Sequence, residues 1–273
     1  MSIKEKLKSN RITYSAIKKI RGLQYGVLEP FCFNIGVELR KIGITSSAIK
    51  KFENEFEGKR CFIIATGPSL TMEDLGLLKD EYTIGMNSLC KVFPELGWET
   101  TFFGVQDFNV FEALNQEIES LSQTMLLCGS NLKTRYKIPS NAYEFPLDLR
   151  NHKLHPADCL NTDFSDDCNV RVYDGYTITY SLIQLAVYFG FKEIYLLGCD
   201  CGYSGTKHHF VEHGVVDPNF STAQQRLFFS YEYAKKYMDT HDVKIFNATR
   251  GGALEIFPRV TLEDVLTVSG EKE

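Results

Sequence analysis

The sequence contains no apolar run long enough to cross a membrane. A membrane-spanning helix needs about 20 consecutive apolar residues, and the 273-residue chain has no such run. Its N-terminus also lacks the apolar segment and small-residue cleavage site of a secretory signal peptide. We therefore expect a cytoplasmic protein, and leave open an association with the inner face of the membrane.

The eight cysteines include no C-x-x-C pair, and only Cys199 and Cys201 lie close together in sequence. The others are scattered through apolar segments of a long chain. This pattern is typical of reduced thiols and argues against a disulfide framework. A cysteine-based metal site is not expected.

Charge is distributed unevenly along the chain. Residues 1–60 hold 13 Lys or Arg against 6 Asp or Glu, whereas the remainder holds 17 against 29. The basic segment spaces apolar residues as an amphipathic helix does. It could pack on the main domain or contact an anionic membrane surface.

The rest of the chain is acidic and has no nucleic-acid recognition motif, which argues against binding to nucleic acid. We predict a helical N-terminal extension over 1–57 and a catalytic domain over 58–273.

Short apolar segments alternate with helical ones from about residue 58 onward. Strands are expected at 60–66, 81–87, 100–107, 124–130, 141–147, 193–200 and 243–249, and the strongest helices at 177–191 and 221–241. Continuous apolar strands are typical of a parallel sheet that is buried on both faces. The alternation predicts a Rossmann-like, doubly wound and mostly parallel sheet.

The first strand ends abruptly in "CFIIATGPSL", residues 61–70. The chain has neither the G-x-G-x-x-G fingerprint nor a Walker loop at this point. Gly67 would allow a sharp turn and a close ligand. Ser69 would cap the next helix, whose free N–H groups attract phosphate. Gly-Pro-Ser is also an ordinary turn, so the motif alone decides nothing.

Other strand ends carry glycine and polar residues as well. They supply Asn87, Gln106, Asp107, Gly198, Asp200 and Tyr203. Ligands of open α/β sheets bind at the carboxyl ends of the strands. Amides, hydroxyls and carboxylates together suit the phosphate, ribose and base of a nucleotide. The pattern predicts a nucleotide site at this edge.

Two groups of titratable residues lie near these strand ends. His208 or His209 could act as a general base, although each could equally face solvent or bond within its loop. Asp107 and Asp200, placed at neighbouring strand ends, could hold Mg²⁺ against a triphosphate. They could instead bind ribose hydroxyls, or Asp107 could cap the following helix.

Four segments taken together resemble a known superfamily. They are "FIIATGPSL", "IGMNS", "LIQLAVYFGFKEIYLLGCD" and "NATRGGALEIFPRVTLEDVL". They are similar to the MptE-like (domain of unknown function 115) superfamily. Its members include bacterial oligosaccharide sialyltransferases, Maf flagellin glycosyltransferases and archaeal 6-hydroxymethylpterin diphosphokinases. The resemblance covers residues 58–266.

The resemblance implies roles for individual residues. Gly67, Pro68 and Ser69 match the loop that holds the donor phosphates, and Asn87 matches the asparagine that contacts CMP. Thr177 falls where the sialyltransferases have a threonine before the apolar helix, and Tyr203 lies where a tyrosine binds donor phosphate. Asp200 matches the aspartate of their "GxD" strand end, and we expect it to be catalytic together with His208 or His209. Thr66, which we also expect to contact the nucleotide, stands where those enzymes have asparagine, and "PNFSTAQQ" lacks their histidine.

These residues favour a nucleotide-sugar-dependent glycosyltransferase that uses a CMP-activated acidic sugar in surface polysaccharide or glycoconjugate synthesis. Its partners would be the donor, a glycan or lipid-linked acceptor, and the membrane through the basic N-terminus. We expect no required cofactor and leave Mg²⁺ open. An ATP- and Mg²⁺-dependent diphosphokinase with Asp107 and Asp200 on the metal is the first alternative. A non-catalytic nucleotide-binding module is the second.

Overall fold

The fold is an α/β sandwich in a computed structural model that describes residues 29–151, 160–202, 210–212, 214 and 222–267. Its strands are β1 (Arg60–Ile64), β2 (Thr83–Met86), β3 (Phe102–Val105), β4 (Met125–Gly129), β5 (Tyr143–Phe145), β6 (Leu147–Asp148), β7 (Val172–Tyr173), β8 (Glu193–Leu197) and β9 (Lys244–Asn247). Its α-helices are α3 (Glu29–Lys41), α4 (Met72–Gly76), α5 (Phe93–Leu96), α6 (Phe108–Ala113), α7 (Asn115–Ser120), α9 (Ile178–Tyr188), α10 (Ala223–Thr240) and α11 (Leu262–Thr267). Short 3₁₀ helices are η2 (Ala48–Phe52), η3 (Asn87–Val92) and η4 (Leu132–Thr134).

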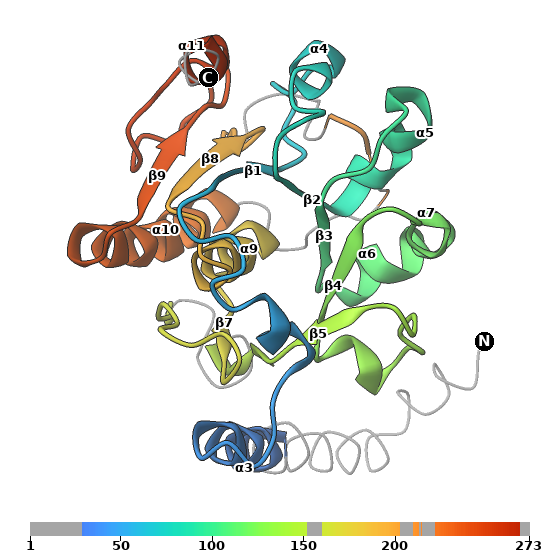
Figure 1. The fold of residues 1–273 in the computed structure, drawn as a ribbon, viewed down its shortest axis with the longest axis vertical. Coiled ribbons are helices and arrows are strands. Elements are labelled where there is room, and N and C mark those ends of the chain that lie inside the picture. Colours follow the sequence, from blue (N-terminus) through green and yellow to red (C-terminus); the bar gives the residue numbers. More distant parts are fainter. Residues whose placement is uncertain (1–28, 152–159, 203–209, 213, 215–221, 268–273) are drawn as a thin grey trace, which may run out of the picture.

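Seven parallel strands form the central sheet in the order β5-β4-β3-β2-β1-β8-β9 (Figure 1). The chain builds outward from β1 to β5 in one direction and then returns to add β8 and β9 on the other side of β1. This reversal makes the boundary between β1 and β8 the topological switch point of the sheet. The prediction of a Rossmann-like, mostly parallel sheet is confirmed.

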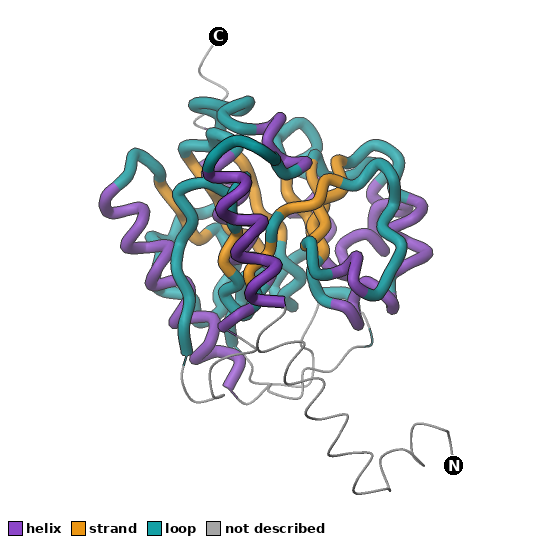
Figure 2. Tube along the Cα trace, turned by 90° about the horizontal axis from the view of Figure 1, so that it is seen from below, coloured by secondary structure: helices purple, strands orange, loops and turns teal. Residues whose placement is uncertain are grey.

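Alternate side chains of each strand enter opposite cores. In β1, Cys61 and Ile63 pack into a core with α9 and α10, whereas Phe62 and Ile64 pack into a core with the helices α4 to α7. Since successive strand residues point to opposite faces, a strand covered on both faces is apolar throughout. Figure 2 shows the strands enclosed by helices on both sides. The continuous apolar runs of the sequence have this cause.

Helix α9 packs on β1, β2 and β3 and is flanked by α10 and β7, which explains why it is buried on nearly all sides. Ten of its eleven residues are buried. Tyr231 and Ala234 of α10 are 1% and 0% exposed and lie in the same core. The predicted helices at 177–191 and 221–241 correspond to α9 and α10.

The segment 48–57 packs with the main core. Ile49 and Phe52 of η2 are 0% and 4% exposed, and the Phe52 ring contacts Phe102 and Phe189. The amide of Phe56 donates to the carbonyl of Phe189 at 2.8 Å. Helix α3 lies further out, beyond the β5 edge of the sheet (Figure 1). The division at residue 57 stays a prediction.

The predicted strand at 141–147 is divided in the structure. Pro146 separates β5 from β6 because proline has no N–H to donate to a strand ladder. Strand β5 pairs with β4, whereas β6 pairs with β7 in a separate two-stranded sheet. The Pro146 carbonyl accepts the amide of Val172 at 2.9 Å. The polar segment 160–174 is thereby attached to the edge of the main sheet.

In the part of the chain that the structure describes, no helix is both long and apolar enough to cross a membrane. The seven cysteines of these residues are free, and all but Cys32 are buried. Burial raises the pKa of the Cys201 thiol to about 12 and thereby keeps it protonated. These thiols act as small apolar core residues.

Candidate functional site at the carboxyl edge of the sheet

Four adjacent strands bring the predicted polar residues to one edge. Strands β3, β2, β1 and β8 are neighbours in the sheet. They run parallel, so their carboxyl ends share that edge. The edge therefore carries Gln106 after β3, Asn87 after β2, Gly67 after β1 and Asp200 after β8. The prediction that these strand ends meet is confirmed, while the roles of the residues stay predictions.

The chain segments after β1 and β8 touch at the switch point. The Gly67 amide donates to the Gly198 carbonyl at 2.8 Å, and the Ala65 amide donates to that of Leu197 at 2.9 Å. A Cβ on Gly67 would lie 2.0 Å from the Asp200 Oδ2 and 2.4 Å from the Gly198 oxygen. Only glycine fits this position, which explains why an apolar strand ends on Gly67.

Ser69 binds Asp200 and does not cap the next helix. Its hydroxyl donates to the Asp200 Oδ2 at 2.8 Å. The N-cap of α4 is Thr71, whose Oγ1 accepts the Asp74 amide at 3.1 Å. The cap prediction was wrong because the turn after Gly67 delays the helix start by two residues. The Ser69 hydroxyl has one proton to donate. It can therefore donate to a phosphate only when its hydrogen bond to Asp200 is broken.

The loop after β9 holds the main chain around Asp200. The Ala253 amide donates to the Asp200 carbonyl at 2.6 Å, and Gly252, with φ +73°, lies directly against that carbonyl. The Thr249 hydroxyl accepts the Cys199 amide at 3.0 Å. The loop after β9 thus holds the backbone of Asp200, and Ser69 holds its side chain. The sequence analysis did not predict that the "NATRGG" segment positions Asp200.

The two arginines of the C-terminal segment are engaged in ion pairs and hydrogen bonds within the protein. Arg250 binds the buried Asp74 through Nε and Nη2, at 2.9 and 2.7 Å, and also pairs with Glu263. The hydrogen bonds from Asp74 and then Glu263 raise the pKa of Arg250 above its ordinary value. Arg259 pairs with Glu255 and donates to the carbonyls of the turn around Gly251. The arrangement makes "RGG" a structural turn.

Asn87 and Gln106 present amides at the ends of β2 and β3. Asn87 begins η3 with φ +50°, a left-handed conformation that asparagine tolerates better than most residues. Gln106 Nε2 donates to the Asp174 Oδ1 at 3.1 Å. The Gln106 Oε1 is buried and has no hydrogen-bond partner among the described residues. The Asn87 amide can recognise a base or ribose edge, whereas the Gln106 amide is engaged with Asp174 and its oxygen is buried.

Asp107 and Thr177 each cap a helix. Asp107 Oδ1 accepts the amides of Asn109 and Val110, at 2.8 and 3.0 Å, at the start of α6. Thr177 Oγ1 accepts the amide of Thr179 at 3.3 Å and starts α9. Capping accounts for both residues structurally; their predicted ligand contacts remain predictions.

Asp107 and Asp200 do not stand at neighbouring strand ends, so that prediction was wrong. Strands β2 and β1 lie between β3 and β8. At about 4.8 Å per strand, the ends of β3 and β8 are about 14 Å apart. One Mg²⁺ ion bound directly by both carboxylates does not fit this spacing. Within the described ranges, no group of three His, Cys, Asp or Glu could hold a metal.

A short segment crosses the ends of β1 and β2. The Phe210 amide donates to the carbonyl of Thr66 at 2.7 Å. The Ser88 hydroxyl donates to the Val211 carbonyl, and the Lys91 ammonium donates to that of Glu212 at 3.0 Å. Thr66 itself is 6% exposed. The predicted residues Tyr203, His208 and His209 lie outside the described residues.

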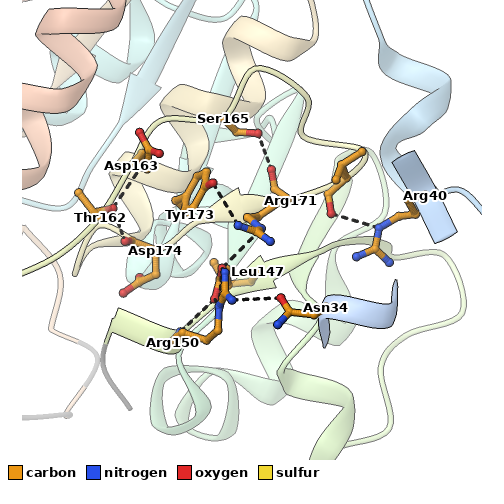
Figure 3. A network of polar contacts seen from close by, with 12 residues as sticks. Asn34, Arg40, Leu147, Arg150, Thr162, Asp163, Ser165, Arg171, Tyr173 and Asp174 are labelled. Carbon is orange, nitrogen blue, oxygen red and sulfur yellow. Dashed lines mark hydrogen bonds and ion pairs between the residues drawn. The ribbon is translucent and has the colours of Figure 1, made fainter. Parts of the chain in front are cut away.

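A buried polar network beside the β3 end was missed in the sequence. Asp174 and Asp148 are 2% and 5% exposed. Arg150 binds both carboxylate oxygens of Asp148, and these hydrogen bonds raise the pKa of its guanidinium. Figure 3 shows Arg150, Arg171 and Asp174 in one cluster. The only signal was the abundance of Asp and Asn in 148–172, which resembles a solvated loop.

The sequence matches the family "6-hydroxymethylpterin diphosphokinase MptE-like" over residues 38–206. This is more than half of the chain, which therefore belongs to the MptE-like family. A search of the curated proteins found no match.

Among solved structures, the chain is similar to a Maf glycosyltransferase from Magnetospirillum magneticum AMB-1, with 16% identity and a TM-score of 0.45 over 82% of this chain. It spans 40% of the length of that protein. It is also similar to the sialyltransferase CstII from Campylobacter jejuni, solved with cytidine-5'-monophosphate. There the identity is 16% and the TM-score 0.46, over 75% of this chain and 86% of that one.

Proposed function

We propose that this protein is a nucleotide-sugar-dependent glycosyltransferase whose donor is a CMP-activated acidic sugar, acting in the synthesis of a surface polysaccharide or glycoconjugate. The observation that supports the proposal is the switch-point geometry, where Gly67 lets the ends of β1 and β8 approach closely and brings the Ser69 hydroxyl within 2.8 Å of Asp200 at the carboxyl edge of the sheet. The strand ends "GPSL", "GMNS" and "LLGCD" resemble the sialyltransferase motifs, and this resemblance favours a CMP-activated acidic sugar as the donor.

Each strand end receives a part of the donor in this proposal. Asn87 and Gln106 bind the nucleoside, because amides can both donate to and accept from base and ribose edges. Asp200 accepts hydroxyl groups, since a carboxylate has no proton to donate. The phosphate lies against the 67–69 turn and Tyr203, where it competes with Asp200 for the Ser69 hydroxyl.

The reaction transfers the sugar from CMP to a hydroxyl group of the acceptor. The acceptor oxygen attacks the anomeric carbon, the bond from that carbon to the phosphate oxygen breaks, and CMP leaves with the bonding electrons. A base takes the hydroxyl proton. His208 or His209 serves as this base, since imidazole titrates near pH 6.5. Both precede Phe210, which is bonded to Thr66 beside the phosphate turn.

The proposal is tested by thermal unfolding of the full chain with CMP, CDP, UDP, GDP and ATP, each with and without Mg²⁺. A ligand at 100 times its Kd stabilises the folded state by about 2.7 kcal/mol. At ~2–4 °C per kcal/mol, CMP should raise the Tm by about 5–10 °C without Mg²⁺. Asn87→Gly should reduce this shift and leave the Tm of the free protein nearly unchanged, because glycine tolerates the φ of +50° at this position. A CMP shift that is absent would refute the proposal.

A diphosphokinase is the second candidate, because the matched family carries that name. It requires a shift with ATP that depends on Mg²⁺. The two candidate carboxylates, Asp107 and Asp200, lie three strand positions apart in the sheet, which disfavours their sharing one ion. Replacing His208 and His209 with alanine distinguishes a transferase from a binding module, since only a transferase loses turnover while keeping its CMP shift.

A further inference from the structure

We propose that a polar pocket beside the β3 end is the subsite for the acceptor sugar, and that this sugar is neutral or carries an amino group. We call it the Asp174 pocket. Its walls include Asn151, Asn161, Thr162, Asp163, Tyr173 and Asp174. This inference rests on the proposed function, because it names the acceptor of that reaction.

The size and chemistry of the Asp174 pocket suit a sugar. Its volume is about 330 Å³, at the lower end of the ~300–1000 Å³ typical of small-molecule sites. Carboxylates and amides dominate its walls, and these groups satisfy the hydroxyls of a sugar ring. Tyr173 adds a half-buried aromatic ring. The exposed Asn161 and Asp163 add polar groups to this lining, which suits a polar ligand better than an apolar one.

The pocket is fixed to the edge of the main sheet. Gln106, directly after β3, donates to the Asp174 Oδ1 at 3.1 Å. Asp174 Oδ2 accepts the Tyr176 amide at 3.2 Å, and the Asp174 carbonyl accepts the side chains of Asn151 and Thr162, each at 2.7 Å. The same Gln106 lies at the edge where the donor is proposed to bind. The pocket therefore borders the donor site.

The charges of the pocket select the class of sugar. Among the described residues, Asp148, Asp163 and Asp174 line it together with one cation, Arg150. Arg150 donates Nε and Nη2 to Asp148, at 2.8 and 2.5 Å, and Nη1 to the Asn34 side chain at 3.0 Å. Figure 3 shows Arg150 turned toward Asn34. The cation is already used by Asp148, so an anionic sugar would be repelled by the exposed Asp163 carboxylate. Hydroxyl and ammonium groups would be attracted.

The test measures sugar binding to the full chain by saturation-transfer NMR and calorimetry, with and without CMP. The probes are methyl β-galactoside, glucosamine and glucuronic acid. We expect the neutral and amino sugars to bind and glucuronic acid not to bind. Failure of both expected sugars to bind, or equal binding of all three, would overturn the proposal.

Variants assign the binding to the pocket. Asp163 is exposed, and Asp163→Lys should weaken glucosamine binding about three- to tenfold, because an exposed charge pair contributes little and lysine replaces its attraction by repulsion. It should also create glucuronic acid binding. Asp166→Lys is the matched control, because Asp166 is also exposed but lies outside the pocket. Asn161→Ala should weaken methyl β-galactoside binding. Unchanged affinities in both pocket variants would refute the assignment.

Binding of CMP and binding of the sugars test two different proposals. If neutral sugars bind at the pocket but CMP does not bind the protein, the proposed transferase function fails and the sugar site remains. If CMP binds and no sugar does, the pocket proposal fails and the donor site remains.

Discussion

Replacing Gly67 with alanine tests the close approach at the switch point. The added Cβ would lie 2.0 Å from the Asp200 Oδ2 and 2.4 Å from the Gly198 oxygen. The Gly198 carbonyl accepts the Gly67 amide, and the Asp200 main chain is held by Ala253. Neither neighbour can move without losing a hydrogen bond. Overpacking of this kind costs about 1–3 kcal/mol.

A smaller effect acts in the opposite direction. Gly→Ala at a compatible backbone position stabilises a protein by about 0.4–1 kcal/mol through the unfolded state. Gly67 does not have a positive φ, so this gain applies and the net loss should be about 0–2.6 kcal/mol, centred near 1.3 kcal/mol. At about 2–4 °C per kcal/mol, the central value lowers the Tm by about 3–5 °C. CMP affinity should fall as well.

Gly76→Ala is the matched control. Gly76 ends α4, and a Cβ there would have nothing within 4 Å. It should leave the CMP shift unchanged and raise stability by up to about 1 kcal/mol. Urea unfolding with a constant m-value measures both variants. If Gly67→Ala is as stable as Gly76→Ala, the contact between the β1 and β8 ends is not as described.

Two further predictions concern the C-terminal loop and the N-terminus. Arg250→Ala should cost about 1–3 kcal/mol, because it removes two hydrogen bonds from Asp74, which is 3% exposed. Glu263→Ala should cost below about 1 kcal/mol because Glu263 is half exposed; equal losses in urea unfolding would refute this difference. Deleting residues 1–28, which hold seven Lys or Arg and one Glu, should weaken binding to vesicles of anionic lipid and leave the Tm unchanged, since η2 is retained. Unchanged sedimentation with anionic vesicles would refute the membrane role.

The central strands could be predicted because they are buried on both faces. Segments such as "CFII" in β1 and "IYLL" in β8 are apolar without interruption. In a chain with intervening helices, this pattern is typical of a parallel sheet that helices cover on both faces. The polar residues that follow the strands could be predicted for the same reason. Their common edge follows from parallel pairing alone.

The neighbours across the sheet could not be predicted from local pattern. Ser69 and Asp200 are 131 positions apart in the chain, and no local preference indicates that the serine donates to that aspartate. The preference of hydroxyl residues for helix caps is equally consistent with Ser69 and Thr71 in this segment. The same limit applies to Asp107 and Asp200, because the strand order that separates them comes from tertiary structure.

The buried carboxylates were hidden for a different reason. Asp148 and Asp174 occur in a segment with the composition of a solvated loop, and charged residues are almost never fully buried unless paired. Their partners, Arg150 and Gln106, make the burial tolerable. Only Arg150 is near its partner in sequence. The Gln106–Asp174 contact joins positions 68 residues apart, and no local pattern in the sequence indicates it.

Gln106 is the residue through which the two proposed subsites are held together. Its backbone continues β3, its carbonyl accepts the Asn131 side chain at 2.8 Å, and its side chain donates to Asp174. A transferase must hold the donor carbon and acceptor oxygen about 3–3.5 Å apart. Regular elements maintain such a distance better than free loops do. Because a single side chain joins the sheet edge to the buried Asp174, the two proposed subsites are tied together at that contact, and residues 148–151 and 160–174 become part of the proposed active site.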